Sequence, residues 1–241
     1  MSNLELRSWQ KNQAMSFKRI INIENYPQGE ELTTALAGIG IKIGAEKIYK
    51  NVNIEDTLIA GVIEGIKGDY RVLSLITNWI EIHFERINVD RLYRAVMLMS
   101  DLKVRCYFSS LHCILKNDSR FKKFKSLYKG ERLLLGLTKE YEFLVNKNKE
   151  DFRFEKSKLI VATNTLRNRK DDIYSVQELS KHHKIYYYRL LIGSSYRADM
   201  IAHLSLNSEL NASELAKKTY GSFATAWDVV RDFRYLDLKA A

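Results

Sequence analysis

Proline and cysteine are scarce in this chain of 241 residues, which has one proline, Pro27, and two cysteines, Cys106 and Cys113. Proline interrupts helices, so its near absence permits long helices almost everywhere. In a helix the two cysteines would lie roughly 10 Å apart along the axis, too far for a disulfide bond. Stability must therefore come from a buried core, which this length allows, and a cytoplasmic location is expected.

Long apolar runs are also absent. The most apolar stretch, residues 32–48, is interrupted by Lys42 and Glu46, so it is not expected to span a bilayer. The first residues carry charged and polar side chains where a signal peptide needs an apolar segment. We therefore expect no membrane segment and a protein that stays in the cytoplasm.

Charge is abundant but unevenly distributed. The net charge is +10, and residues 120–190 hold 18 Lys and Arg against 9 Asp and Glu. Residues 1–119 hold 15 against 14, and residues 191–241 hold 6 of each sign. An excess of positive charge is typical of a protein with an acidic partner such as nucleic acid, and here the middle of the chain supplies it.

Apolar residues recur at helical spacing in the first half of the chain. A helix is predicted from Asn53 to a stop near Gly68, and a second follows over 72–82. Asn88 is predicted to cap a third helix over 89–99, because its side chain can accept a hydrogen bond from the first turn. With further apolar segments at 108–114 and 121–127, residues 30–128 are expected to form a compact helical array.

The basic middle has a less regular pattern. Residues 133–145 are predicted to be helical, whereas KLIVAT at 158–163 and IYYYRLLI at 185–192 are β-branched or aromatic runs that could be strands. The polar stretches 146–150 and 167–172 are loop candidates. The predicted fold is mainly α with a few short strands: a helical domain over 1–145, a basic connecting region over 146–190, and a helix-turn-helix module over 191–241.

Three helices are predicted in the last 50 residues. The first covers 197–205, the second begins after Asn211 or Ser213, and the third begins after Ser222. Gly221 is expected to supply a positive φ in the turn before the third helix. The third helix should bury three apolar residues, with Leu236 packing behind it: Ala226, Val229 or Val230, and Phe233. This spacing suits a helix-turn-helix, and an ordinary three-helix packing unit is the alternative.

The same segment resembles the winged-helix family of bacterial transcription regulators. The resemblance is carried by the phrase LLIG at 190–193, followed by Arg197-Ala198-Asp199, and it covers about 50 residues. It implies binding to double-stranded DNA through the third helix, and a homodimer. The DNA-contact residues it implies lie on that helix: Ser222, Phe223, Thr225, Trp227, Arg231 and Arg234.

The exposed side of this third helix departs from the family's pattern. Asp228 and Asp232 have the wrong sign for phosphates, although Arg231 could pair with guanine or phosphate. Phe223 and Trp227 would suit a protein partner as well as DNA. The alternative hypothesis is therefore an interaction protein that docks another polypeptide through these two aromatic residues.

Only seven residues follow Arg234, too few for a full basic wing. Phosphate contacts are therefore expected mostly upstream, and the candidates are Lys122, Lys123, Lys125, Arg167, Arg169, Lys170, Lys217 and Lys218. Tyr128 and Tyr186–Tyr188 could add aromatic surface. The alternative is that the lysines form a solvated face and the tyrosines belong to the core.

No arrangement of residues indicates an enzyme. The five histidines lack metal-ligand spacing, and there is no phosphate-loop motif. The sequence therefore predicts no catalytic residue, no metal and no cofactor. The predicted function is DNA-binding transcription regulation by the helix-turn-helix and the basic segment that precedes it.

Overall fold

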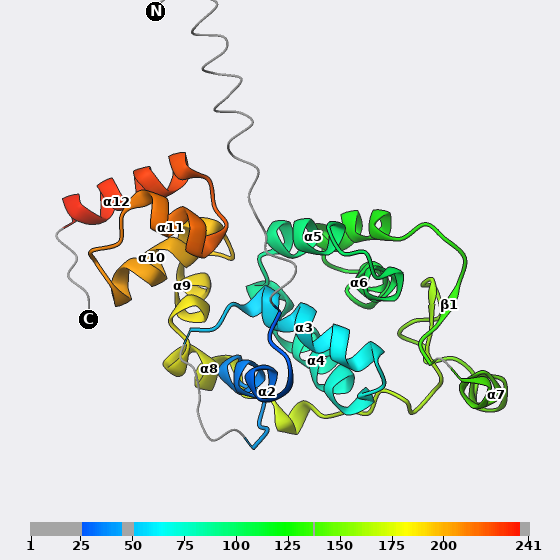
Figure 1. Cartoon of the computed structure of the whole chain (residues 1–241). Helices are drawn as coiled ribbons and strands as arrows, with labels where there is room; N and C mark the ends of the chain where they lie inside the picture. The colour runs from blue at the N-terminus through cyan, green and yellow to red at the C-terminus, as the bar shows by residue number, and fades with distance from the viewer. Residues whose placement is uncertain (1–25, 45–50, 137, 237–241) are drawn as a thin grey trace, which may run out of the picture. The chain divides into compact units, whose positions relative to one another are not determined.

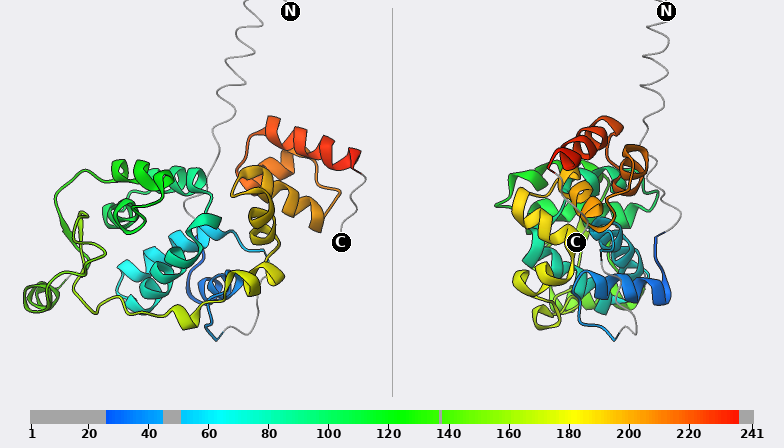
Figure 2. Two further views of the ribbon diagram at one scale, coloured as in Figure 1. Left: turned by 180° about the vertical axis from the view of Figure 1, so that it is seen from behind. Right: turned by 90° about the vertical axis from the view of Figure 1, so that its left-hand side faces the viewer.

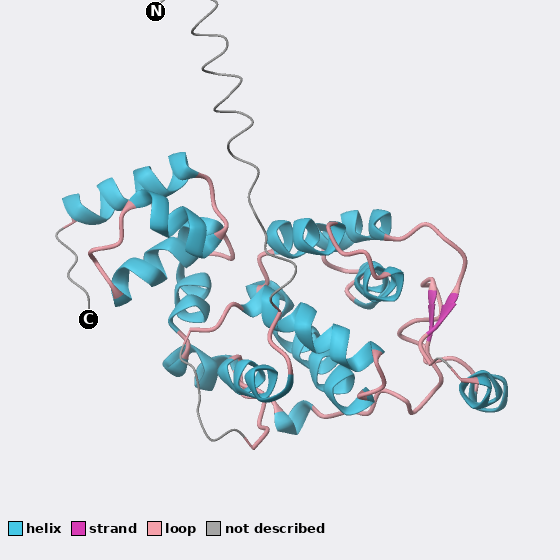
Figure 3. Ribbon diagram, viewed as in Figure 1, coloured by secondary structure: helices cyan, strands magenta, loops and turns pink. Residues whose placement is uncertain are grey.

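The computed structural model describes residues 26–44, 51–136 and 138–236, and it confirms a mainly α-helical chain with one two-stranded sheet (Figures 1 and 3). The first half contains α2 (Gly29–Gly38), α3 (Ile54–Ile66), α4 (Tyr70–His83), η1 (Phe84–Arg86), α5 (Val89–Met97), α6 (Leu102–Ile114) and η2 (Ser119–Leu127). The second half contains β1 (Leu133–Leu134), α7 (Lys139–Asn148), β2 (Leu159–Ile160), η3 (Lys170–Asp172), α8 (Val176–His182), α9 (Lys184–Ile192), α10 (Tyr196–Leu206), α11 (Ala212–Thr219) and α12 (Phe223–Tyr235).

The chain divides into two compact units between Ser194 and Ser195. We call residues 23–194 the large unit, and the described residues from 195 to 236 the small unit. The expected connecting region, 146–190, is instead part of the large unit, because it contributes buried apolar side chains to that unit's core: Phe154, Leu159, Val161, Leu166, Ile173 and Leu179. The predicted boundary at 190 falls inside α9, four residues before the observed one.

Helices α3 and α4 form the centre of the large unit and lie side by side (Figure 1). A Cβ atom at Gly65 of α3 would lie 2.5 Å from Leu73 Cβ of α4, so glycine is needed for this close approach. Trp79 of α4 is fully buried and donates a hydrogen bond from Nε1 to the Ile39 carbonyl at 2.8 Å.

The predicted helix starts in the first half are confirmed. Asn53 accepts a hydrogen bond from the Asp56 amide at 3.0 Å, and Asn88 accepts one from the Arg91 amide at 3.1 Å. The segment 121–127 is a 3₁₀ helix, η2, rather than an α-helix. Its period of three places Phe121, Phe124 and Leu127 on one buried side.

Two predictions in the basic middle are corrected. Residues 185–192 form helix α9 rather than a strand, because Ile185, Tyr186 and Arg189 are buried at helical spacing. Residues 133–134 form strand β1, which pairs in parallel with β2 of the predicted KLIVAT strand, and the predicted helix begins only at Lys139. That helix runs to Asn148, into a segment that we expected to be a loop.

A buried ion pair joins α9 to α3. The Arg189 guanidinium, 1% exposed, donates to the two Glu55 carboxylate oxygens at 2.6 and 2.9 Å and to the Arg86 carbonyl at 2.8 Å. Burial alone would raise the pKa of Glu55, but the nearby Arg189 charge and its hydrogen bonds hold that pKa below its ordinary value. Glu55 is therefore ionised and fully paired inside the large unit.

Two buried histidines support the same region. His183 caps α9: its Nδ1 accepts from the Tyr186 amide at 3.2 Å, and its Nε2 faces the Val52 carbonyl at 3.0 Å. His83 Nδ1 lies 2.7 Å from the Tyr186 hydroxyl, and its Nε2 lies 3.1 Å from the Tyr174 carbonyl. Each ring thus needs one protonated nitrogen to donate to a carbonyl, which suits the neutral form.

The small unit contains the three predicted helices, which lie together in both views of Figure 2. Their shared core contains Met200, Leu204, Leu210, Leu215, Ala226, Val229, Val230 and Phe233. Asn211 and Ser222 cap α11 and α12. Leu236, expected to pack behind α12, is exposed.

The turn between α11 and α12 uses its glycine differently from our expectation. The positive φ, +55°, belongs to Tyr220, and Gly221 has no positive φ. A Cβ atom at Gly221 would overlap the Met200 terminal methyl group, so glycine is needed there for close packing. Tyr220 adopts the left-handed conformation that ends α11.

Candidate nucleic-acid interface

Helix α12 presents an aromatic outer face in the small unit. Phe223 is 40% exposed and Trp227 is 51% exposed, and Ala224, Arg231 and Arg234 are also exposed. Ser222 and Thr225 are half-buried, and their hydroxyl groups lie 2.7 Å apart at the helix start. The two aromatic side chains are thus more accessible than the two hydroxyl groups that we predicted to contact DNA.

Arg231 is held by acidic residues of its own helix. Its guanidinium lies 3.2 Å from Asp228 Oδ1 and 3.0 Å from Asp232 Oδ1, and it sits over the Trp227 ring at 5.2 Å. Asp232 is also paired with Arg197 of α10 at 2.6 Å. Hydrogen bonds from Arg197 and Arg231 lower the pKa of Asp232, which keeps its carboxylate ionised.

The small unit has no excess of positive charge. Residues 195–236 contain five Lys and Arg and five Asp and Glu. Lys217 and Lys218 are exposed on α11, as is Arg234 on α12. No strand follows α12 as far as Leu236, and residues 237–241 lie outside the described residues. Among the described residues, the excess of positive charge therefore lies in the large unit.

Six lysines of the large unit line one hollow of about 520 Å³, which we call the lysine groove. Its lining residues are Lys122, Lys123, Lys125, Lys129, Lys156 and Lys158, with Ser109, His112, Ser126 and Tyr128 between them. Helix η2 supplies the first three lysines. Phe121, Phe124 and Leu127 form its buried face, so the residues between them point outward.

The lysine groove contains no acidic lining residue. Lys123 lies 3.5 Å from Asp90 Oδ1 and 5.2 Å from the centre of the Tyr93 ring. The other five lysines make no ion pair within the part of the chain that the structure describes. Uncompensated charges gathered in one hollow attract a multiply charged anion, and a lysine ammonium group is a common phosphate ligand.

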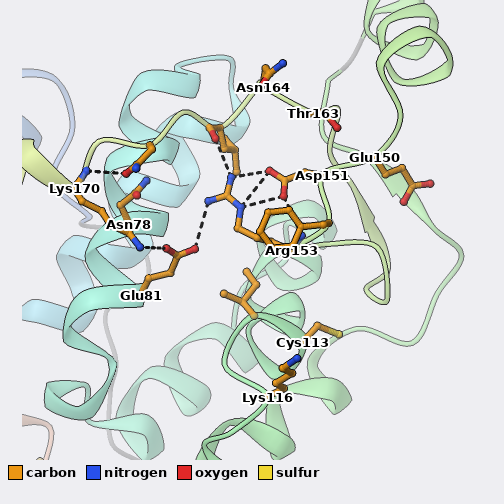
Figure 4. A pocket seen from close by; sticks show the side chains of 14 residues that line it. Asn78, Glu81, Cys113, Lys116, Glu150, Asp151, Arg153, Thr163, Asn164 and Lys170 are labelled. Atoms are coloured by element: carbon orange, nitrogen blue, oxygen red, sulfur yellow. Dashed lines mark hydrogen bonds and ion pairs between the residues drawn. The ribbon is translucent and has the colours of Figure 1, made fainter.

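A second hollow of the large unit, the polar pocket, has a volume of about 670 Å³ and is centred on Arg153. Figure 4 shows Arg153 between Asp151 and Glu81. Its guanidinium lies 2.6 Å from Asp151 Oδ2, 3.4 Å from Glu81 Oε1 and 2.8 Å from the Leu166 carbonyl. Lys170 pairs with the other Glu81 oxygen at 3.2 Å.

The predicted phosphate-contact residues lie in several places. Lys122, Lys123 and Lys125 share the lysine groove, whereas Lys170 lines the polar pocket. Arg167 and Arg169 line a third hollow of about 360 Å³, where Arg169 pairs with Asp172 at 2.8 Å. Sequence reasoning did not join Lys156 and Lys158 to the lysines of η2, because β1, α7 and their connections lie between them in the sequence.

The aromatic residues proposed as nearby surface differ in burial. Tyr128 lines the lysine groove, and Tyr187 is exposed, whereas Tyr186 is fully buried in the core. Tyr128 is thus the tyrosine of this set that the structure brings to the clustered lysines.

A histidine and a cysteine, His112 and Cys113, lie next to each other on α6. Cys113 Sγ lies 3.3 Å from His112 Nε2, but burial raises the pKa of Cys113, which favours the protonated thiol. No group of three or more His, Cys, Asp or Glu is placed to hold a metal ion in the described ranges. No described helix is long and apolar enough to cross a membrane.

Comparison of the chain with models of protein families, with curated protein sequences and with solved structures gives no match. A function can therefore be inferred only from the geometry and charge of the two units.

Proposed function

We propose that this chain is a DNA-binding regulatory protein whose main phosphate contacts lie in the lysine groove of the large unit. The observation that carries the proposal is the convergence of six lysines on one hollow without an acidic lining residue. The three packed helices of the small unit also support it, since exposed Phe223 and the Thr225 methyl group on α12 could contact thymine methyl groups. The small unit has equal numbers of positive and negative side chains, so its proposed role is to orient the protein on the duplex and to contact bases.

Reversing the charge of two groove lysines is expected to weaken duplex binding by more than about tenfold. In the Lys125→Glu/Lys156→Glu variant, two phosphate partners are lost, so the slope of log affinity against log salt should fall by about two. Fluorescence anisotropy with a labelled duplex, over a series of salt concentrations, measures both quantities.

The matched control is Lys147→Glu/Lys181→Glu, which makes the same change in net charge with two exposed lysines that line none of the three hollows. Its effect should be several times smaller. Equal losses of affinity for the two variants would show that net charge, and not the groove, determines duplex binding. The absence of duplex binding by the wild-type chain at low salt would contradict the proposal.

A second candidate function is protein docking through α12, and the observation that favours it is the exposed pair Phe223 and Trp227 beside an internally paired Arg231. Exposed aromatic residues next to arginine are typical of binding hot spots. The partner is a second copy, as the winged-helix resemblance implies, or another polypeptide.

Trp227→Asp is expected to weaken such a complex by about 2–4 kcal/mol and to leave the helical content unchanged. Sedimentation of the purified chain measures association between copies, and co-purification followed by sedimentation measures association with another polypeptide. Leu206→Asp is the control, because Leu206 is an exposed apolar residue of α10 in the same unit. A complex that survives Trp227→Asp would rule out docking through this face.

A further inference from the structure

The lysine groove and the polar pocket of the large unit are lined in part by neighbouring residues of the same two segments. On the last turn of α6, His112 lines the groove and Cys113 lines the pocket, and Cys113 Sγ lies 3.3 Å from His112 Nε2. On the loop that follows α7, Phe152 and Arg153 line the pocket, whereas Lys156 lines the groove. Two segments of the chain, the last turn of α6 and the loop after α7, thus contribute side chains to both hollows.

The shared loop is held in place by its middle residue. Phe154 is fully buried, and its amide donates to the Asp151 carbonyl at 2.9 Å. The Ser157 amide donates to the Phe154 carbonyl at 2.7 Å. Phe152, two residues before this anchor, is 83% exposed on the pocket side. A large ring left this exposed on a fixed loop offers a stacking surface.

The two hollows differ sharply in charge. The groove is lined by six lysines and no acid, whereas the polar pocket is lined by three acidic and three basic residues: Glu81, Glu150, Asp151, Lys116, Arg153 and Lys170. Most of the pocket's charges are compensated by ion pairs, since Arg153 and Lys170 share Glu81, and Arg132 pairs with Glu150 at 2.5 Å. The groove therefore suits a polyanion, and the pocket suits an uncharged group that forms hydrogen bonds.

Three asparagines add neutral hydrogen-bonding groups to the pocket: Asn78, Asn164 and Asn168. The Asn78 side chain is fixed, because its Nδ2 donates to the Ser74 carbonyl at 2.7 Å and to the Arg167 carbonyl at 3.1 Å. Asn78 is itself 1% exposed and belongs to the wall, whereas Asn164 and Asn168 are exposed at the pocket. Amide groups and paired carboxylates that surround a stacking ring match the donor and acceptor edges of a nucleobase.

We propose that the two hollows form one nucleotide site, with phosphates in the lysine groove and an unpaired base in the polar pocket. This inference rests on phosphate binding by the groove, which the proposed function also requires, and it adds recognition of the base. A nucleotide of a single-stranded nucleic acid and a free nucleoside polyphosphate share this chemistry. The experiment separates these two sources.

The test compares ligands that carry a base with ligands of equal phosphate number that lack it. Adenosine triphosphate is compared with inorganic tripolyphosphate, and a short single-stranded oligonucleotide with an abasic strand of equal phosphate number, by calorimetry on the full chain. We expect the base to strengthen binding by about tenfold in at least one pair, as stacking of a base on an aromatic side chain does. The pair that responds identifies the source.

Two variants locate the effect. Phe152→Ala should remove the gain due to the base and leave tripolyphosphate affinity unchanged, whereas Phe143→Ala, which changes an exposed phenylalanine of α7 outside the hollows, should leave both unchanged. Lys125→Glu/Lys156→Glu should weaken every ligand, because it alters the phosphate part of the site.

The result that overturns the inference is equal affinity for ligands with and without bases, or a gain due to the base that persists in Phe152→Ala. Duplex binding that depends on the groove but shows no such gain would reject this inference and retain the proposed function. Stronger binding of adenosine triphosphate than of tripolyphosphate, in a chain that fails to bind duplex, would retain this inference and reject the proposed function.

Discussion

Glu55→Gln is expected to lower the free energy of unfolding of the large unit by about 3–5 kcal/mol. The substitution preserves the shape of the side chain but leaves the Arg189 guanidinium buried without its counter-charge. Arg91, whose Nε lies 3.8 Å from Glu55 Oε2, also loses part of its counter-charge. The Asn88 amide, which donates to Glu55 Oε1, loses a charged acceptor. Uncompensated buried charge is among the most destabilising changes a folded protein can undergo.

Urea unfolding followed by circular dichroism measures this loss. Glu85→Gln is the matched control, because Glu85 is exposed and pairs with Arg86 at 3.0 Å near the surface; its cost should stay below about 1 kcal/mol. Arg189→Met alone should also be strongly destabilising, since it leaves the Glu55 carboxylate buried. Equal, small losses for the two glutamate variants would show that Glu55 is not a paired, ionised residue of the core.

Acid is expected to destabilise the large unit as the pH falls from 6.5 to about 4. Burial lowers the pKa of His83 and of His183 from 6.5 to about 4 in the folded protein. Between these values the unfolded chain binds more protons than the folded chain, so stability is complete above pH 6.5 and is lost as the pH falls. The interval corresponds to about 3 kcal/mol for each imidazole.

His183→Asn is expected to reduce this pH dependence by about half. The asparagine preserves a side-chain acceptor at the start of α9 but has no group that titrates in this range. Free energies of unfolding at several pH values between 7 and 4 give the comparison, and His182→Asn, at an exposed neighbouring histidine, is the control. A pH dependence of the same size in the His183 variant would show that this ring does not contribute to acid unfolding.

Local signals in the sequence predicted much of the helical architecture. Asn53, Asn88 and Ser222 each precede an apolar pattern of helical spacing, and each accepts a hydrogen bond from the first turn of its helix. Caps and periodicity act within a few residues, so one sequence contains the information needed to place them. The core of the small unit was predictable for the same reason.

Long-range pairing explains where the predictions failed. The run at 185–192 has the composition of a strand, but Arg189 in its middle reaches Glu55, 134 positions earlier in the chain, and the helical form buries this contact. Tertiary contacts of this kind override local preference, and a single sequence does not identify the partner. The assignment of 146–190 to a connecting region was wrong. Its buried apolar residues are separated by charged ones, so they form no regular apolar pattern in the sequence.

The candidate interface was predictable in part. The exposed side of α12 follows from helix geometry, so Phe223, Trp227 and Arg231 were identified as exposed in advance. The ion pair between Arg197 and Asp232 joins two helices and was not predicted. The lysine groove likewise depends on the chain returning along β2 beside β1, which brings Lys156 and Lys158 to the lysines of η2.

The three-residue repeat of η2 limits how this part of the protein can vary during evolution. One inserted or deleted residue between Phe121 and Leu127 would rotate lysines into the core and phenylalanines into water, whereas exchange of lysine for arginine would preserve the groove's charge. In any related chain that retains the groove, we therefore expect the number of residues in this segment to be constant and the identity of its basic residues to drift. Such relatives would be recognised better by the spacing of their buried aromatic residues than by overall identity.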